Sequence, residues 1–546
     1  MLDSSDTTAD RERCPAIRGR SGGWKAGFLL LVNQGLATLA FVGVEVNLVF
    51  FLKRVLQQNN EEAANNGLVL LSLSTSLFLL NPSGCGDRKS PCGHHSMLET
   101  GVFYLSIYLI ALGNGGYQPS IATFGADQFD DEEPKEGHSK ETFFSYFYLA
   151  LNLGCLFSNT ILGYLENEGM WVLGFWTSSG FAFIALVHFL SGTRWYRRFK
   201  PGGNPLSRVC QVIFAAAKKW RVEMSPHGND LYEVDQKESA IKGSRKMLHT
   251  QGLKFLDRAA AITSKDYNQD HVLPCNPWRL CTITQVEELK CILRLLPIWL
   301  STILYWVVFT QMASLFIEEG AGMITTISNF HIPPASMSSV NIITVAAFTF
   351  LYQQILNPLI CRLRKKDVKG LTELQRMGVG LIIAVMAMVS AGIVESYRLK
   401  YSKGDCYDCH NPSSLSVLWQ IPQYVLIGVS EVFMYVGQLE FFNGQTPDGL
   451  KSFGSALCMT SLSLGNYVSS LLVTIVMDIT TKDNRPGWIP ENLNVGHMDR
   501  FYFLLAALTA ADFAVYLLCA KRYRYIRLEG NCEDPNAAEE EVGRVL

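Results

Sequence analysis

Ten long apolar blocks constrain the fold of this chain more than any other feature. A helix needs about 20 residues to cross the hydrocarbon core of a bilayer, and the blocks are close to that length. They cover residues 27–52, 102–122, 143–165, 171–190, 293–316, 342–360, 378–394, 417–442, 453–477 and 501–520. Their apolar residues are nearly continuous instead of following one helical face. The sequence therefore predicts an all-α, multi-pass membrane protein.

Composition supports this fold class and excludes several functions. Hydrophobic residues make up 48% of the chain and charged residues only 18%, whereas an ordinary soluble domain is about a quarter charged. The net charge of −2 does not favour nucleic acid as a partner. The chain has no Gly-rich nucleotide loop of the Walker type and no hydrolase arrangement of Ser, His and Asp. We therefore expect neither an enzyme nor an ATP-driven pump, and no cofactor or metal.

Basic loops predict the topology. An eleventh apolar run, 67–80, has only fourteen residues, which is short for a crossing. If it does not cross, the N-terminal tail (1–25), the linker (191–292), the loop at 362–366 and the C-terminal tail (521–546) all lie on one side. Lys and Arg gather in these four segments, so that side is expected to be the cytosol. The long linker separates the spans into two groups, 26–190 and 293–520, and the plasma membrane is the expected location.

A dense polar loop joins the second and third spans. It reads FGADQFDD at 124–131, and its three carboxylates cannot lie in hydrocarbon. The next span opens FFSYFYLALNLG at 143–154. Together the two segments resemble the proton-dependent oligopeptide transporter (POT) family, whose signatures are FGxDQFD and FYxxxNxGxL. The matching residues are Phe124, Gly125, Asp127, Gln128, Phe129, Asp130, Phe147, Tyr148, Asn152 and Gly154.

The resemblance implies a major-facilitator fold of two six-helix bundles, with a small-molecule or ion substrate held between them near the midplane of the bilayer. Segments 276–290, 295–299, 332–337, 435–442 and 463–473 extend it through the C-terminal half. The chain looks most like the plant nitrate/peptide branch, and closely like its xylem-loading low-affinity nitrate subgroup. Low-affinity nitrate transport is therefore the leading expectation. Potassium/proton exchange, which is linked to some members of that subgroup, is an alternative.

The N-terminal bundle departs from the family pattern. After Asn66 the sequence runs directly into a segment resembling the back half of helix three, so helix two and part of helix three are missing. The expected bundle is incomplete. A second alternative is thus a non-transporting variant, either inactive or associated with other transporter subunits.

Glu431 is the leading candidate for the substrate or proton pathway. It lies inside the span 417–442, where an ionisable side chain is costly, and it matches the family's carboxylate on helix ten. The alternative is a structural carboxylate paired with a neighbouring Ser, Tyr or Arg. Glu440 follows nine residues later, two and a half helical turns on, and so faces the opposite side. We expect it near the membrane interface.

Other pathway positions lack the charges found in relatives. The family's ExxER cluster on helix one is replaced by residues Gln34 to Thr38, the helix-four Lys by Gln118, and the helix-seven His by Phe309. Proton symport by the usual route is therefore not expected. Glu45, in the first span, either replaces a lost proton carrier or lies near the outer interface, where its side chain reaches water.

Two cysteine pairs fall in loops that the topology places outside the cell, where disulfides persist. They are Cys85 with Cys92 and Cys406 with Cys409. The leading interpretation is a disulfide or free thiols in each loop. Nearby His94, His95 and His410 leave zinc as an alternative, and the sequence CYDCH at 406–410 fits the CxxCH pattern of haem attachment.

Overall fold

The structure is a computed structural model of the chain. It describes residues 8–9, 22–54, 97–129, 134–163, 165, 170–199, 205–222, 231–233, 247, 249–250, 252–263, 266, 276–327, 330–332, 334–363, 371–402, 413–447, 450–481, 486–490 and 492–526. Within these ranges only the backbone is described for 8–9, 43–54, 100, 134–138, 141, 198–199, 205–206, 327, 330–331, 335, 361, 363 and 452. Some predicted features lie outside this part of the chain. They are the run 67–80, Asp130, the side chain of Glu45, and the cysteines Cys85, Cys92, Cys406 and Cys409.

Long helices make up almost all of the described chain, which confirms the predicted fold class. The N-terminal half contains α1 (Gly23–Arg54), α3 (Met97–Ala126), α4 (Pro134–Phe157) and α6 (Trp171–Ser191). The C-terminal half contains α9 (Ile283–Ala313), α10 (Leu315–Ala321), α11 (Ser338–Leu351), α12 (Asn357–Leu363), α13 (Glu373–Tyr401), α14 (Ile421–Gly444), α15 (Lys451–Thr480) and α16 (Met498–Arg522). Between the halves lie the shorter α7 (Pro205–Lys218) and α8 (Lys254–Asp257).

Nine helices in the described residues are long and apolar enough to cross a membrane. They match nine of the ten predicted spans. The remaining block, 143–165, is also helical, but its helix begins earlier, at Pro134, and continues from Phe157 into the π-helical segment Ser158–Leu162. The first two turns of this helix are polar, which lowers its mean hydropathy. For this reason the helix is not among the nine that are apolar enough to count as spans.

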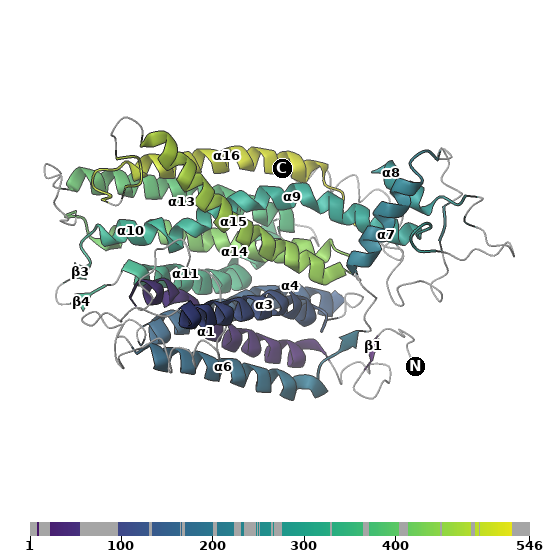
Figure 1. Cartoon of the computed structure of the whole chain (residues 1–546), viewed down its shortest axis with the longest axis horizontal. Coiled ribbons are helices and arrows are strands. Elements are labelled where there is room, and N and C mark those ends of the chain that lie inside the picture. The colour runs from purple at the N-terminus through teal and green to yellow at the C-terminus, as the bar shows by residue number, and fades with distance from the viewer. Residues whose placement is uncertain are drawn as a thin grey trace.

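The ends of several helices meet at one end of the molecule (Figure 1). At the start of α1, Gly22 N donates to Trp195 O (2.8 Å), beyond α6, and Gly23 N donates to Gln128 O (2.7 Å), beyond α3. Asp127 also pairs with Lys451, the first residue of α15. Tyr523, just after α16, donates to Gln445 Oε1 at the end of α14. The first and last spans therefore begin and end on the same side of the bundle.

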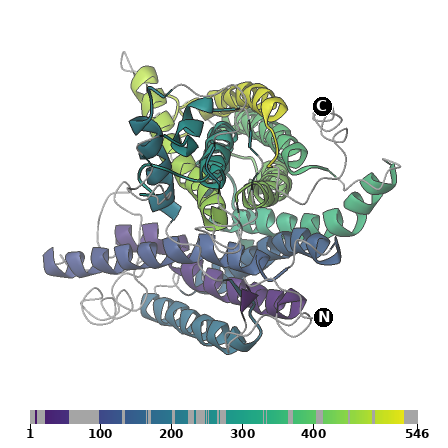
Figure 2. The same cartoon turned by 90° about the vertical axis from the view of Figure 1, so that its right-hand side faces the viewer.

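The two halves form two groups of helices that pack along one junction. Seen from the end of the bundle, α1, α3, α4 and α6 lie below the helices of the C-terminal half (Figure 2). The larger buried cluster lies in the C-terminal half and centres on α9, α13, α14 and α16. A smaller one joins α1, α3 and α4. Two-residue strands add little: β1 (Thr8–Ala9) pairs with β2 (Arg198–Phe199), and β3 (Thr326–Ile327) with β4 (Phe330–His331).

Ion pairs hold the linker segment that follows α7. Asp266 accepts from Lys219 Nζ at 2.9 Å and from Arg279 Nε at 2.7 Å. Burial alone would raise the pKa of Asp266, but hydrogen bonds from Thr263, Lys219 and Arg279 outweigh it and hold the pKa below its ordinary value. The carboxylate thus stays ionised and joins α7 to the segment that leads into α9.

Candidate functional site

Glu431 lies where the two halves meet. Its side chain is buried in the middle of α14. The Tyr148 hydroxyl, from α4 in the N-terminal half, donates to Oε1. The Asn341 amide, from α11 in the C-terminal half, donates to Oε2 at 3.1 Å. One carboxyl group therefore contacts helices from both halves, as a group must if it is to respond to their relative movement.

Helical spacing places three polar groups on this face of α14. Glu431, Tyr435 and Gln438 are separated by four and three residues, so they lie on one side of the helix. The ring of Tyr435 lies 4.5 Å from that of Tyr148 and 5.8 Å from that of Trp306, measured between centroids. The face is thus lined by aromatic rings with a carboxyl at one end and an amide at the other.

Gln438 is held by three neighbours. Trp306 Nε1 donates to its Oε1 at 3.2 Å, and its Nε2 donates to Thr302 Oγ1 (3.2 Å) and Ser461 Oγ (2.7 Å). These contacts join α14 to α9 and α15. They fix the orientation of the amide, because the indole N–H can only donate.

Our sequence prediction named Glu431 and Tyr148 but not their contact. It missed Asn341, Trp306 and Gln438 as neighbours of the same site. A signal for Gln438 was present, since a buried amide seven residues after a buried carboxylate lies on the same helix face. Nothing in the sequence indicates which side of α11 faces α14, and so the contact of Asn341 with Glu431 could not be predicted. The Tyr148 contact also agrees with the structural interpretation of Glu431, for which a Tyr partner was expected.

Glu440 lies near the end of α14, as expected, but its side chain is largely shielded from solvent. It forms an ion pair with Arg376 at the start of α13, and each side chain is only 8% exposed. Its partner Arg376 differs from the partners of Glu431, which are Tyr148 and Asn341. The two carboxylates therefore belong to separate sites.

The predicted uncharged positions on α1 and α3 come together. Gln34 Nε2 lies 3.2 Å from Gln118 Oε1 and 3.3 Å from Thr38 Oγ1. Gln34 and Thr38 are buried. Phe309 belongs to a different group, because its ring packs against Trp306 with centroids 5.3 Å apart. The three polar side chains form a neutral contact between helices, with no ionisable member to carry a proton.

Several signature residues have structural roles around the loop after α3. Gln128 Oε1 accepts from Arg197 N (2.7 Å), and its Nε2 donates to Arg197 O (3.1 Å), so it clamps the loop to the segment after α6. Asp127 reaches the C-terminal half through Lys451 at 3.1 Å. The aromatic signature residues Phe129 and Phe147 are buried in the N-terminal cluster, and Phe124 packs against it.

Two signature glycines permit close approach. A Cβ on Gly125 would lie 2.2 Å from Cζ of Phe143. A Cβ on Gly154 would lie 2.5 Å from the carbonyl oxygen of Gly35, which holds α4 directly against α1. Asn152, one turn after Tyr148, donates back to the Tyr148 carbonyl at 2.9 Å. Within the two signatures, Tyr148 is thus the residue that touches the central carboxyl.

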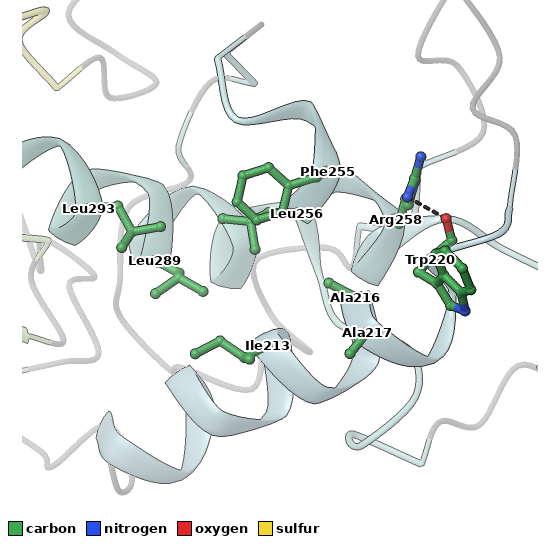
Figure 3. Close-up of a pocket in the computed structure, with 9 residues that line it drawn as sticks. All are labelled: Ile213, Ala216, Ala217, Trp220, Phe255, Leu256, Arg258, Leu289 and Leu293. Carbon is green, nitrogen blue, oxygen red and sulfur yellow. Dashed lines mark hydrogen bonds between the residues drawn. The ribbon is translucent and has the colours of Figure 1, made fainter.

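An apolar cavity of about 410 Å³ lies elsewhere, between α7, α8 and α9 (Figure 3). Its lining includes Ile213, Trp220, Phe255 and Leu289, and Arg258 at its edge donates to the Trp220 carbonyl. It is distant in the sequence and in the fold from Glu431. Apart from Arg258, whose guanidinium group donates to the Trp220 carbonyl, the lining is apolar. The cavity therefore does not fit a transport site for a small ion.

One group of described residues has the spacing of metal ligands: His249, Asp257 and Glu287. Lys290 Nζ lies 2.6 Å from Asp257 Oδ1 and 2.7 Å from Glu287 Oε1. The ammonium group therefore already supplies the positive charge that a metal ion would bring. This arrangement fits an ion-pair network that anchors the start of α9.

Comparison with known proteins agrees with the signatures and the helical architecture. A sequence model described as the POT family matches residues 65–489. Protein NRT1/PTR FAMILY 7.3 of Arabidopsis thaliana is 59% identical over 99% of this chain and 94% of its own length, and Protein NRT1/PTR FAMILY 7.2 of the same plant is 57% identical over 99% and 98%. The alignment with the first covers 580 positions, 34 more than the 546 residues of this chain. At least that many residues of the relative therefore have no counterpart here.

Solved structures give the same fold. The POT family transporter PepTSo has a TM-score of 0.59 at 20% identity, covering 91% of this chain and 98% of that one. An auto-inhibited POT family peptide transporter also has a TM-score of 0.59 at 20% identity, covering 93% and 99%. The family match, the close plant relatives and the shared fold lead to one conclusion: this chain is a member of the POT family of membrane transporters.

Proposed function

We propose that this protein moves a small ion across the membrane by alternating access between its two halves, with Glu431 as the group that senses their separation. The observation that carries this proposal is the contact of one buried carboxyl with Tyr148 from one half and Asn341 from the other. Movement of the halves apart at this level would remove the Tyr148 hydroxyl from the carboxyl. Proton binding and substrate binding would then be linked at the same place.

Nitrate is the first candidate substrate, on the basis of the sequence resemblance. The charge of the site determines in which protonation state of Glu431 nitrate could bind. Glu431, its partners Tyr148 and Asn341, and the residues Tyr435 and Gln438 on the same face of α14 include no cation. An ionised carboxylate would repel an anion. Nitrate would therefore enter with Glu431 in its neutral, protonated form. This predicts that nitrate and a proton move together, although the helix-one cluster of relatives is absent.

Potassium/proton exchange is the second candidate, and the same observation favours it. An ionised Glu431 attracts a cation, and the faces of Trp306 and the neighbouring tyrosines also favour positive charge. In this case potassium and a proton would compete for the carboxyl and move in opposite directions. The direction of the proton gradient that drives flux thus distinguishes the two candidates.

The full-length chain is tested in proteoliposomes with isotopically labelled nitrate and with rubidium as the potassium tracer. We expect flux above protein-free liposomes for one of the two ions and loss of its proton dependence in Glu431→Gln. Tyr148→Phe should weaken the dependence, because it removes only the hydroxyl donor. Glu318→Gln, which changes an exposed carboxyl on α10, is the matched control and should behave as wild type. Flux of either ion that is unchanged in Glu431→Gln would contradict the role of this residue.

A non-transporting form is the other alternative, and the alignment difference of at least 34 residues with the first plant relative supports it. Removal of helices from one half would leave the substrate path without part of its wall. Folded protein at normal abundance with no flux of either ion would favour this alternative. Association with an intact relative would then be checked by co-purification.

We also propose that the end of the bundle carrying the start of α1 and the end of α16 faces the cytosol. In this organisation a linker (191–292) connects the bundles 26–190 and 293–520, between the tails 1–25 and 521–546. Described basic residues at that end support the orientation under the positive-inside rule. They include Lys218, Arg221, Arg258, Lys521, Arg522 and Arg524. Tags at the two termini should both be protected from an impermeant label in intact cells, with the plasma membrane as the expected location.

A further inference from the structure

A second buried carboxyl, Glu319, lies away from Glu431, at the end of the bundle opposite the start of α1 (Figure 1). Glu319 is on α10, which packs there against the start of α14 and against α16. Its side chain is fully buried. Gln423 Nε2 donates to Glu319 Oε2 at 3.1 Å, and the Tyr502 hydroxyl lies 3.4 Å from the same oxygen. These donors are both neutral, and in the described structure Glu319 forms no ion pair.

The nearest cation is already paired with another carboxylate. Arg398 donates to both oxygens of Glu395, from Nε at 2.6 Å and from Nη2 at 2.8 Å. Its Nη1 donates to Asn494 Oδ1 at 2.7 Å, and Nη2 also reaches the Leu493 carbonyl at 3.1 Å. The guanidinium group therefore neutralises Glu395. If Glu319 were ionised, the buried group would keep one negative charge without a counterion, which is strongly unfavourable in a medium of low dielectric constant.

Three buried oxygen atoms of Glu319 and its glutamine neighbours have no hydrogen-bond partner. They are Glu319 Oε1, Gln420 Oε1 and Gln423 Oε1. The amide of Gln420 cannot simply be turned round, because its Nε2 donates to the Phe316 carbonyl at 2.8 Å. Gln423 Nε2 is likewise committed to Glu319. An acceptor-rich group of this kind lacks a hydrogen-bond donor.

We propose that Glu319 binds a proton and that the protonated acid donates from Oε1 to Gln420 Oε1. A single proton removes the uncompensated charge and supplies the missing donor. It also joins α10 to the residue that immediately precedes α14, so proton binding stabilises the closed packing of this end of the bundle. Separation of α10 from α14 would expose the acid to water and release the proton. The site is distinct from Glu431, and its protonation does not depend on the proposed transport.

Several packed elements place polar or charged groups near Glu319. The groups that face it or its neighbouring carboxylate are Gln420, Gln423 and Tyr424 on or before α14, Tyr502 and Asp499 on α16, Glu395 and Arg398 on α13, and Asn494 in the preceding loop. Arg398 is the one cation among them, and Glu395 occupies two of its donors. Among these groups, Glu319 therefore has no cation left to neutralise it, and proton binding is expected at Glu319 itself.

Infrared spectroscopy of the purified full-length protein tests the proposal. At neutral pH the wild-type spectrum should contain the carbonyl stretch of a protonated carboxylic acid that Glu319→Gln lacks. The matched control Glu318→Gln alters the adjacent exposed carboxyl and should keep that band. If Glu319→Gln instead removes an ionised carboxylate band, the proposal is overturned.

Thermal unfolding across pH provides a second readout. The folded wild type holds a proton that the unfolded chain releases above about pH 4. Its unfolding equilibrium constant should therefore increase with pH, by up to about tenfold per pH unit for one proton. The Glu319 contribution to this slope should be absent in Glu319→Gln and in Glu319→Met, and present in Glu318→Gln. If neither Glu319 variant folds while Glu318→Gln does, the negative charge itself is required and the proposal is wrong. Stabilisation by sodium or potassium in place of the pH dependence would also overturn it.

Discussion

Helices α3 and α14 have nearly equal hydropathy, but α3 is mostly exposed on the surface of the protein and α14 is mostly enclosed by other helices. The most apolar windows of the two spans have mean hydropathies of 1.3 and 1.4. In α3 only 24% of the window's residues are buried within the protein, whereas in the span containing α14 the share is 78%. Leu105, Tyr108, Leu109 and Leu112 of α3 are each more than half exposed. Hydropathy thus identifies both helices as membrane spans but does not indicate which one has protein neighbours, because lipid tails are as apolar as leucine.

The gap that the sequence predicts in the N-terminal half would give a physical reason for this difference. The predicted gap follows Asn66, before α3, and the first plant relative has at least 34 residues without counterparts here. Helices absent from this half would leave a neighbouring helix without part of its packing surface. The C-terminal half has no such predicted gap, and α14 contacts α4, α9, α11, α13 and α15. If the predicted gap is real, the exposed face of α3 is a surface from which neighbouring helices are absent.

Glycine substitutions should give the largest contrast between the two helices. A Cβ on Gly428 of α14 would lie 2.8 Å from Asn341 Oδ1 and 3.0 Å from the Asn341 carbonyl oxygen. Gly428→Ala should therefore push α11 away and lower the free energy of unfolding by about 1–3 kcal/mol. Gly113→Ala in α3 is the matched control, because nothing lies within 4 Å of its added Cβ. It should be neutral or slightly stabilising, as alanine favours helix.

Thermal unfolding of the purified variants measures this contrast. Because Asn341 also holds Glu431, Gly428→Ala should in addition reduce any proton-dependent flux. A loss of stability in Gly113→Ala as large as that in Gly428→Ala would show that α3 is covered in the folded protein, and the comparison would fail.

Amide substitutions should give a smaller contrast. Gln438→Leu removes the acceptor of Trp306 Nε1 and two interhelical hydrogen bonds. Because interhelical hydrogen bonds in membranes contribute modestly, we expect a loss of about 1–2 kcal/mol. Gln118→Leu in α3 removes the one bond to Gln34 that the structure gives it and should cost less. Equal losses in denaturation measurements would indicate that polar contacts in α3 are as well packed as those in α14.

The ion pair between the halves should have the smallest effect. Asp127 and Lys451 join α3 to α15 at 3.1 Å, and their side chains are 21% and 16% exposed. A double-mutant cycle with Asp127→Asn and Lys451→Met should give a coupling energy of about 0.2–1 kcal/mol that decreases in high salt. A coupling that is insensitive to salt would indicate a drier junction between the halves than the structure shows.

Local sequence signals predicted the helices well and the contacts of the site poorly. The block 102–122 indicated α3 because continuous apolar character requires a helix in hydrocarbon. The spacing of Glu431, Tyr435 and Gln438 indicated one face, since helix geometry is local. The partners of Glu431 come from elements 283 and 90 positions away in the sequence. Which side of α4 and α11 meets α14 depends on packing between spans, which hydropathy does not encode. The position of Glu440 near the end of its helix could be read from the sequence, but its ion pair with Arg376 of another helix could not.

The sequence by itself determined that this chain is a helical membrane protein of the POT family, because apolar length and the two signatures are local properties. It also determined that the helix-one proton cluster is absent, since no ionisable side chain occupies 34–38. Only the tertiary structure decided that Tyr148 and Asn341 hold Glu431 between the halves, that Glu319 is buried without a counterion, and that α3 is exposed while α14 is enclosed. These outcomes depend on how helices turn and pack against one another. In hydrocarbon, a helix of given hydropathy is equally compatible with lipid or protein neighbours.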